Sequence, residues 1–375
     1  MSSLSVEQKL FFQLSKPSAS ADEISHQLEA SSPGPDGIDF EMVFDLAVSN
    51  GTAGFLYKKT KELKLFPEKL EQELYAIYKD NVFHNLKAVA DTLRLITHLQ
   101  ASGIESIPLK GAHASDMIFE DMGVYQFSDI DLLVSEENLQ KVKRLLIEEQ
   151  GFEQTSLSEE DLLASHYHLM YTKDNHMLVE VHWNLAKRYI EIPSSFWWEE
   201  CSMQQWNNRE ITVLSVEKYL MYAVFRLFDH CFHPLRFFVL IAGIIEKYSD
   251  EIDWDKLLEF CTRYKMKKMM VFTLQLLQEW LGKDIPEVIR HEKIVGGNYL
   301  KGLVLSGLMS GIERPHLRMM AYTMLLDSPL AIFKILVGRL FPGKEELRLR
   351  YGLSANSWKV YLYYFLNPFL LLFRR

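Results

Sequence analysis

Two aspartates separated by one residue stand at the start of an apolar run. Asp129 and Asp131 open the segment DIDLLV, which is typical of a β-strand. Successive side chains of a strand point to opposite faces, so both carboxylates project to the same side, roughly 7 Å apart along the strand. Neighbouring carboxylates repel each other unless a cation lies between them. Hard divalent cations, Mg²⁺ above all, bind such oxygen pairs and keep open positions for phosphates.

A Lys-Gly pair ends the apolar run that precedes this strand. Lys110 and Gly111 close the segment IPLKG, and Asp129 follows Gly111 by eighteen residues. Glycine lets a backbone approach a phosphate closely, and the helix expected over residues 112–119 would offer free N–H groups to an anion. We therefore expect Lys110 and Gly111 to contact phosphate groups.

A third carboxylate lies in the segment MLVEVHW, residues 177–183. Strand alternation places Leu178, Glu180 and His182 on one face. If this strand lies beside the strand of Asp129, Glu180 completes a cluster of three carboxylates. His182 shares the face of Glu180, so we expect it to position Glu180, to contact a phosphate, or to pack at the wall of the cleft.

The order of these elements resembles the nucleotidyltransferase superfamily of DNA polymerase β. The segments PLKG, SDIDLLV and VEVHW resemble, more narrowly, a bacterial branch of nucleotidyltransferase family proteins in which Lys-Gly replaces the more usual Gly-Ser or Gly-Gly. The resemblance covers nearly the whole chain. It implies an α+β fold, namely a polymerase-β-like nucleotidyltransferase palm flanked by N-terminal helices and a C-terminal helical domain. The boundaries that we expect are 1–103, 104–214 and 215–375.

The resemblance also implies an activity, which is transfer of a nucleoside monophosphate from an NTP, expected to be ATP, to a hydroxyl or similar acceptor, with release of pyrophosphate. The cofactor would be Mg²⁺, with Mn²⁺ as an alternative. The catalytic and metal-binding residues would be Asp129, Asp131 and Glu180, and the nucleotide-binding and phosphate-binding residues would be Lys110, Gly111 and His182. At the start of the C-terminal helical region, Arg226 and Arg236 could face the palm and hold a triphosphate.

Two features leave other functions open. Family members often carry Arg four residues before the first Asp, where this chain has Tyr125, so stacking by Tyr125 or another group would have to replace that Arg. The helical flanks make up well over half of the chain, which would suit a non-catalytic binding or scaffold protein on the same fold. The presence of all three acids favours the enzyme. A zinc site is a further alternative, built from His166, His168, His176 and His182.

Charge is spread unevenly along the 375 residues, whose net charge is −9. Residues 101–200 hold 7 Lys/Arg against 19 Asp/Glu, a balance of −12. A long nucleic-acid duplex needs a basic stripe, so we expect a small-molecule or protein acceptor in preference to a large RNA. Three cysteines without CxxC spacing, and an N-terminus without a basic and apolar leader, predict a cytoplasmic protein.

The C-terminal tail is basic and apolar. Residues 331–375 hold 8 Lys/Arg against 2 Glu, a balance of +6. The run from Val360 to Phe373 is mostly apolar, contains Asn367-Pro368, and is too short to span a membrane. A helix that docks on the core is one interpretation. A weak contact with a membrane surface or another protein is the other, because aromatic residues lie beside terminal arginines.

Overall fold

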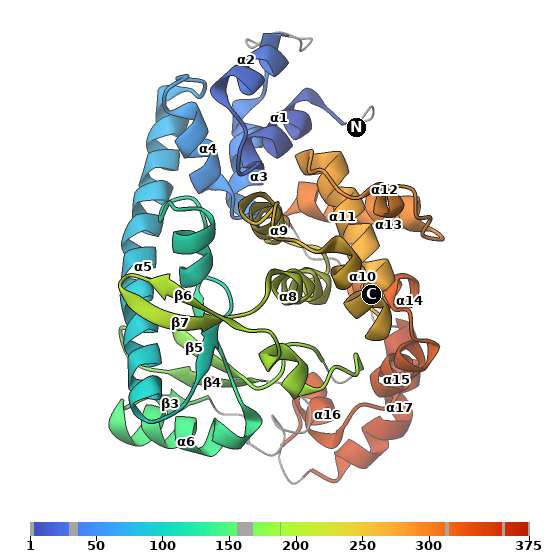
Figure 1. Ribbon diagram of the computed structural model, residues 1–375. Helices are drawn as coiled ribbons and strands as arrows, with labels where there is room; N and C mark the ends of the chain where they lie inside the picture. Colours follow the sequence, from blue (N-terminus) through green and yellow to red (C-terminus); the bar gives the residue numbers. More distant parts are fainter. Residues whose placement is uncertain are drawn as a thin grey trace.

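The computed structural model describes residues 4–29, 37–155, 168–187, 189–311, 315–354 and 357–373. Five helices precede the sheet: α1 (Val6–Ser15), α2 (Ala21–Glu29), α3 (Phe40–Ser49), α4 (Ala53–Thr60) and α5 (Glu68–Ala101). The 34-residue α5 runs along one side of the molecule past the sheet (Figure 1). Pro67 stands at its N-cap, and Gly103, with φ +69°, follows its end. Apolar residues that recur at steps of three or four, Val89, Leu93, Ile96 and Leu99, are buried along one face of this helix.

A five-stranded mixed sheet lies at the centre, with the order β1-β2-β5-β4-β3. Its strands are β1 (Ser106–Pro108), β2 (Asp129–Val134), β3 (Glu153–Gln154), β4 (His168–Thr172) and β5 (Leu178–His182). β2 and β5 run parallel, whereas the other neighbouring pairs are antiparallel. β4 and β5 form an antiparallel hairpin. A mixed sheet surrounded by many helices confirms the expected α+β class.

In the described residues, short helical turns and the α-helix α6 connect the strands. They are η2 (Ala114–Ile118), η3 (Glu136–Asn138), α6 (Leu139–Arg144), η4 (Leu145–Glu149) and η5 (Ser194–Trp198). A second, two-stranded sheet follows, made of β6 (Ser202–Trp206) and β7 (Arg209–Val213), and it packs beside β1. This hairpin is not among the elements expected from the sequence. Its signal is Asn207-Asn208, which adopt φ 48° and 62° and so form the left-handed turn that suits two-residue hairpins.

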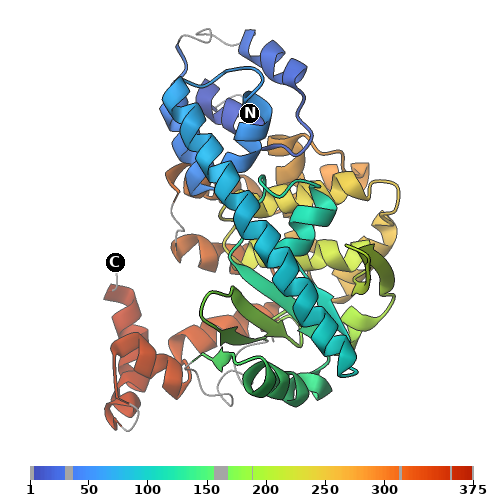
Figure 2. The same ribbon diagram turned by 90° about the vertical axis from the view of Figure 1, so that its left-hand side faces the viewer.

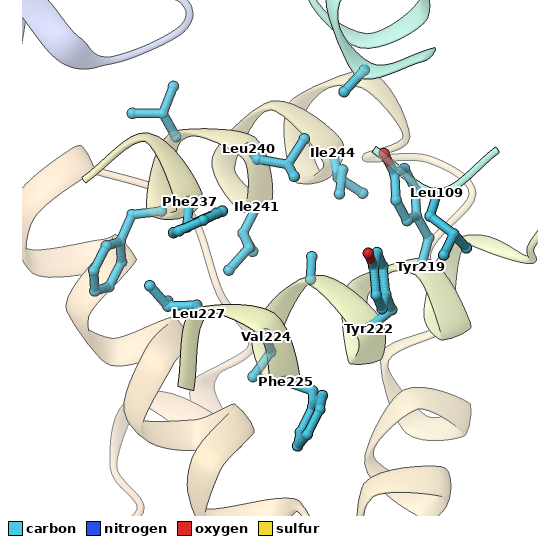
Figure 3. Close-up of a cluster of buried hydrophobic side chains, with 14 of the residues drawn as sticks. Leu109, Tyr219, Tyr222, Val224, Phe225, Leu227, Phe237, Leu240, Ile241 and Ile244 are labelled. Carbon is cyan, nitrogen blue, oxygen red and sulfur yellow. The ribbon is translucent and has the colours of Figure 1, made fainter. Parts of the chain in front are cut away.

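Ten helices complete the described chain: α8 (Val216–Asp229), α9 (Arg236–Lys247), α10 (Trp254–Arg263), α11 (Lys267–Leu281), α12 (Glu287–Arg290), α13 (Gly297–Ser310), α14 (Pro315–Leu325), α15 (Pro329–Leu340), α16 (Lys344–Tyr351) and α17 (Lys359–Phe373). α8 and α9 are buried around most of their circumference, and their facing side chains form part of the core (Figure 3). Leu109 of the β1 end packs beside Tyr219 of α8 in the same cluster, so the helical region directly contacts the end of the first strand.

The last three helices extend away from the body of the molecule (Figure 2). The main core runs from Leu4 to Ala331 and includes no residue of α16 or α17. Within the described chain, none of the helices combines the length and apolarity that crossing a membrane requires.

Candidate functional site

Parallel pairing of β2 and β5 brings distant acids together. The register places Asp131 opposite Glu180, while Asp129 lies two residues earlier on the same face of β2. One oxygen of Asp131, one of Glu180 and one ring nitrogen of His182 all lie within 4.8 Å of one another. The structure thus juxtaposes acids that are separated by about fifty residues in the sequence, and it meets the condition that the two strands be neighbours.

Lys110 occupies the space between the two aspartates. Its Nζ lies 2.8 Å from Oδ2 of Asp129 and 2.8 Å from Oδ2 of Asp131, and its side chain is only 8% exposed. Burial by itself would lower the pKa of Lys110, but the charges of Asp131 and Asp129 outweigh burial and raise that pKa above its usual value. The ammonium group is therefore charged at neutral pH and neutralises part of the acid pair.

His182 bridges the other side of the cluster. Its Nε2 lies 2.9 Å from Oδ1 of Asp131 and 3.4 Å from Oε2 of Glu180, and the residue is fully buried. Burial opposes the charged imidazolium, yet the bonds to Asp131 and Glu180 prevail and raise the pKa of His182. For Glu180, burial would raise the pKa, but the hydrogen bond and charge of His182 lower it to about 2. Glu180 is consequently ionised at neutral pH and is a weak base.

Gly111 allows the backbone to turn back toward β2. Its φ is +63°, and a Cβ atom at this position would lie 2.9 Å from Cδ2 of Phe127 and 3.1 Å from the carbonyl oxygen of Asp129. Both the left-handed backbone and the close approach therefore favour glycine. The helix expected over 112–119 is present over residues 112–118, and η2 is its π-helical part. A contact of Gly111 with phosphate stays a prediction.

Tyr125 is part of the interior. It is 1% exposed, and its ring stacks on Phe119 with centroids 5.2 Å apart. Its carbonyl oxygen accepts a hydrogen bond of 2.8 Å from Nδ2 of Asn85 on α5. Tyr125 thus joins α5 to the loop before β2, and its ring already packs against Phe119.

α8 adds a cation near the cluster. Arg226 is 9% exposed, and its positive charge opposes protonation of Lys110. Arg236, at the start of α9, contributes a positive charge that acts on Tyr125. Arg226 is therefore close enough for its charge to act on Lys110, as the sequence suggested, whereas the side chain of Arg236 lies against Gly51.

Other histidines of this region are placed differently. The ring of His168 lies 5.0 Å from the ring of His182, whereas His176 packs edge-on against Phe152. His166 lies outside the described residues. Among the described residues, the group suited to a metal ion consists of Asp131, Glu180 and His182. Because His182 alternates onto the face of Glu180, the same strand pattern could have indicated it as a ligand.

A mixed sheet that carries a buried cluster of acids with an imidazole defines an α+β protein with a candidate cation site. The family model described as "Uncharacterised nucleotidyltransferase" matches residues 36–282, which is more than half of the chain. The chain belongs to this nucleotidyltransferase family. No curated protein and no solved structure matches it. Family membership supports a transferase-type enzyme that acts on a nucleotide.

Proposed function

We propose that this protein is a Mg²⁺-dependent nucleotidyltransferase with a polymerase-β-like palm. It would move a nucleoside monophosphate from an NTP, ATP being our first candidate, to a hydroxyl of a small-molecule or protein acceptor and release pyrophosphate. The main support is the convergence of Asp129, Asp131 and Glu180 on one face of two adjacent strands, within a chain of a nucleotidyltransferase family. We also propose the division into units 1–103, 104–214 and 215–375.

The donor set fits a hard divalent ion. Asp131 and Glu180 offer carboxylate oxygens and His182 offers a ring nitrogen, all within reach of one centre, and Asp129 adds a carboxylate nearby. Mg²⁺ favours the carboxylate oxygens of this set, while the imidazole nitrogen suits Mn²⁺. When bound, such an ion would neutralise phosphate charge and activate the acceptor hydroxyl.

Side chains of this protein would also bind the phosphates and position the acids. The ammonium of Lys110 faces Asp129 and Asp131 and would stabilise the charge of nucleotide phosphates that reach this position. His182 would hold Asp131 and Glu180 in place through its Nε2 contacts. The low pKa of Glu180 favours a role as a ligand over a role as the general base.

One observation favours the alternative of a non-catalytic binding or scaffold protein. Lys110 and His182 lie directly between the acids, and Asp131 is 2% exposed. The cluster is therefore largely neutralised by its own neighbours, as a purely structural ion-pair network would be.

The experiment that tests the enzyme incubates the purified protein with Mg²⁺, labelled NTPs and a cell extract as the source of acceptors. Mass spectrometry then identifies labelled products. Asp129→Asn keeps the shape of the side chain and removes its charge, while Glu137→Gln alters an exposed acid of η3 and serves as the matched control. We expect loss of at least about two orders of magnitude in transfer for Asp129→Asn and none for Glu137→Gln.

The two functions differ in their response to nucleotide. Thermal melting with Mg²⁺ and each NTP in turn would reveal specific binding as a rise in Tm. Equal transfer by Asp129→Asn and the native protein would remove this aspartate from the mechanism. If the folded protein binds no NTP and yields no labelled product with any extract, the scaffold function is the correct one.

A further inference from the structure

The three C-terminal helices form a unit that is joined by a buried asparagine. Nδ2 of Asn367 in α17 donates to the carbonyl oxygens of Arg339 and Leu340, at 3.0 and 2.8 Å. Its Oδ1 accepts from Nη1 of Arg350 at 3.0 Å and from the hydroxyl of Tyr351 at 2.7 Å. Asn367 thus connects the end of α15, the end of α16 and the middle of α17. Helix α17 continues through Pro368, so the apolar run is one helix.

This arrangement leaves apolar side chains of α17 on the outside. Trp358, just before the helix, is 70% exposed, and Phe365 is 76% exposed. The exposed large apolar residues recur at helical spacing along one stripe of α17: Trp358, Tyr361, Leu362, Phe365, Leu366, Phe369 and Leu370. The hypothesis that this helix docks on the core is not what the structure shows, because none of the α17 side chains that the structure describes belongs to the main core.

α15 adds a second apolar stripe. Ala331 belongs to the main core, and Ile332 and Ile335 pack against it, so one side of the helix faces the body. Its exposed large apolar residues are Leu330, Phe333, Leu336, Val337 and Leu340, and Phe341 follows the helix end. α15 and α17 contact each other, so the two stripes lie in one protruding unit (Figure 2). An exposed apolar surface of this extent marks an interaction site.

The positive charge of the three C-terminal helices indicates which kind of partner this surface binds. Residues 331–375 carry a balance of +6, and Arg339, Lys344 and Lys359 are exposed beside the apolar stripes. A second copy placed symmetrically on this surface would bring two such positive segments together, which is unfavourable. An anionic lipid surface attracts positively charged segments. Its interfacial layer also accommodates exposed aromatic side chains.

We propose that α15 and α17 form a docking surface for membranes that contain anionic lipids. The helices would lie in the interface, with the apolar stripes among the acyl chains and the basic residues at the headgroups. This inference is independent of the proposed transferase activity, because it rests on residues outside the acid cluster.

Vesicle flotation of the full-length protein tests the proposal. The vesicles are phosphatidylcholine alone or phosphatidylcholine with added phosphatidylglycerol. The apolar variant is Trp358→Glu combined with Phe365→Glu, and the charge variant is Arg339→Gln combined with Lys359→Gln. The matched control is Phe83→Glu, which alters an aromatic side chain of α5 that is 64% exposed and distant in sequence from this surface.

We expect the native protein and Phe83→Glu to float with the anionic vesicles, less so as salt rises, and to remain unbound with phosphatidylcholine alone. Each double variant should lower the affinity for anionic vesicles by roughly tenfold or more. Circular dichroism verifies that the variants fold. The proposal is overturned if native protein floats with neither vesicle, if both double variants float like native protein, or if light scattering reveals a dimer that the apolar variant abolishes.

Discussion

Replacing Lys110 with methionine removes the cation between two buried acids. Methionine keeps the length and apolar stem of lysine, but it leaves Asp129 and Asp131 without the ammonium that lies 2.8 Å from each. Because the Lys110 and Asp131 side chains are 8% and 0% exposed, solvent screens their interaction weakly. Breaking a buried ion pair by removing one partner costs about 3–5 kcal/mol. We expect a loss of this size in the free energy of unfolding when divalent cations are chelated.

A divalent ion should restore part of this loss. In Lys110→Met the carboxylates of Asp129 and Asp131 form an anionic site without a resident ammonium, so Mg²⁺ should bind more tightly than it does to the native protein. Mg²⁺ at a hundredfold excess over its Kd would recover about 2.7 kcal/mol. The assay is urea unfolding followed by tryptophan fluorescence, with chelator and with Mg²⁺.

The control is Lys218→Met, which removes another buried lysine. Lys218 donates to the carbonyl oxygen of Glu199 and lies over the ring of Phe196, 4.5 Å from its centroid. This variant should lose stability that Mg²⁺ does not restore. If Lys110→Met unfolds at the same urea concentration as native protein in chelator, or if Mg²⁺ affects both variants equally, the reasoning about the acid pair is wrong.

Three further predictions concern other parts of the molecule. Gly111→Ala should lower the free energy of unfolding by about 2 kcal/mol or more, because backbone strain at φ +63° adds to the clash with Phe127. Gly103→Ala, with φ +69° and no neighbour within 4 Å, should lower it by only about 1 kcal/mol, and thermal melting of both variants measures the difference. Burial lowers the pKa of His113 to about 4, below the ordinary histidine pKa of about 6.5, so the unfolded chain takes up the proton first and stability should fall as pH drops from about 6.5 towards 4. Urea unfolding across this range should be less pH-dependent in His113→Gln, and an unchanged slope would contradict the assignment. Asn367→Ala should release α17, seen as faster amide exchange in residues 339–367 with unchanged exchange in α5; equal exchange would refute its connecting role.

Alternation along single strands predicted which side chains of the site share a face. Asp129 and Asp131 share a face because they are two residues apart, and Glu180 and His182 do so for the same reason. The sequence does not predict that these two strands are neighbours, because strand pairing depends on the whole fold. The parallel register of β2 and β5 places Asp131 opposite Glu180.

The sequence does not predict which groups the charged side chains contact. We expected Lys110 to face phosphate, and the structure places its ammonium between Asp129 and Asp131. A long flexible side chain selects its partner by distance and burial, and neither is encoded in local spacing. The close approach of Phe127 and of the Asp129 carbonyl oxygen to Gly111, which adds to the demand of its positive φ, is likewise set by the fold.

The C-terminal tail shows the same division. Its sequence by itself determined a short apolar helix in a basic segment, because periodicity and composition are local properties. Only the tertiary structure decided that Asn367 joins three helices and that the apolar stripes face outward, since burial depends on what else packs against a helix. Local pattern determines which side chains share a face, and the packing of distant segments determines what that face meets.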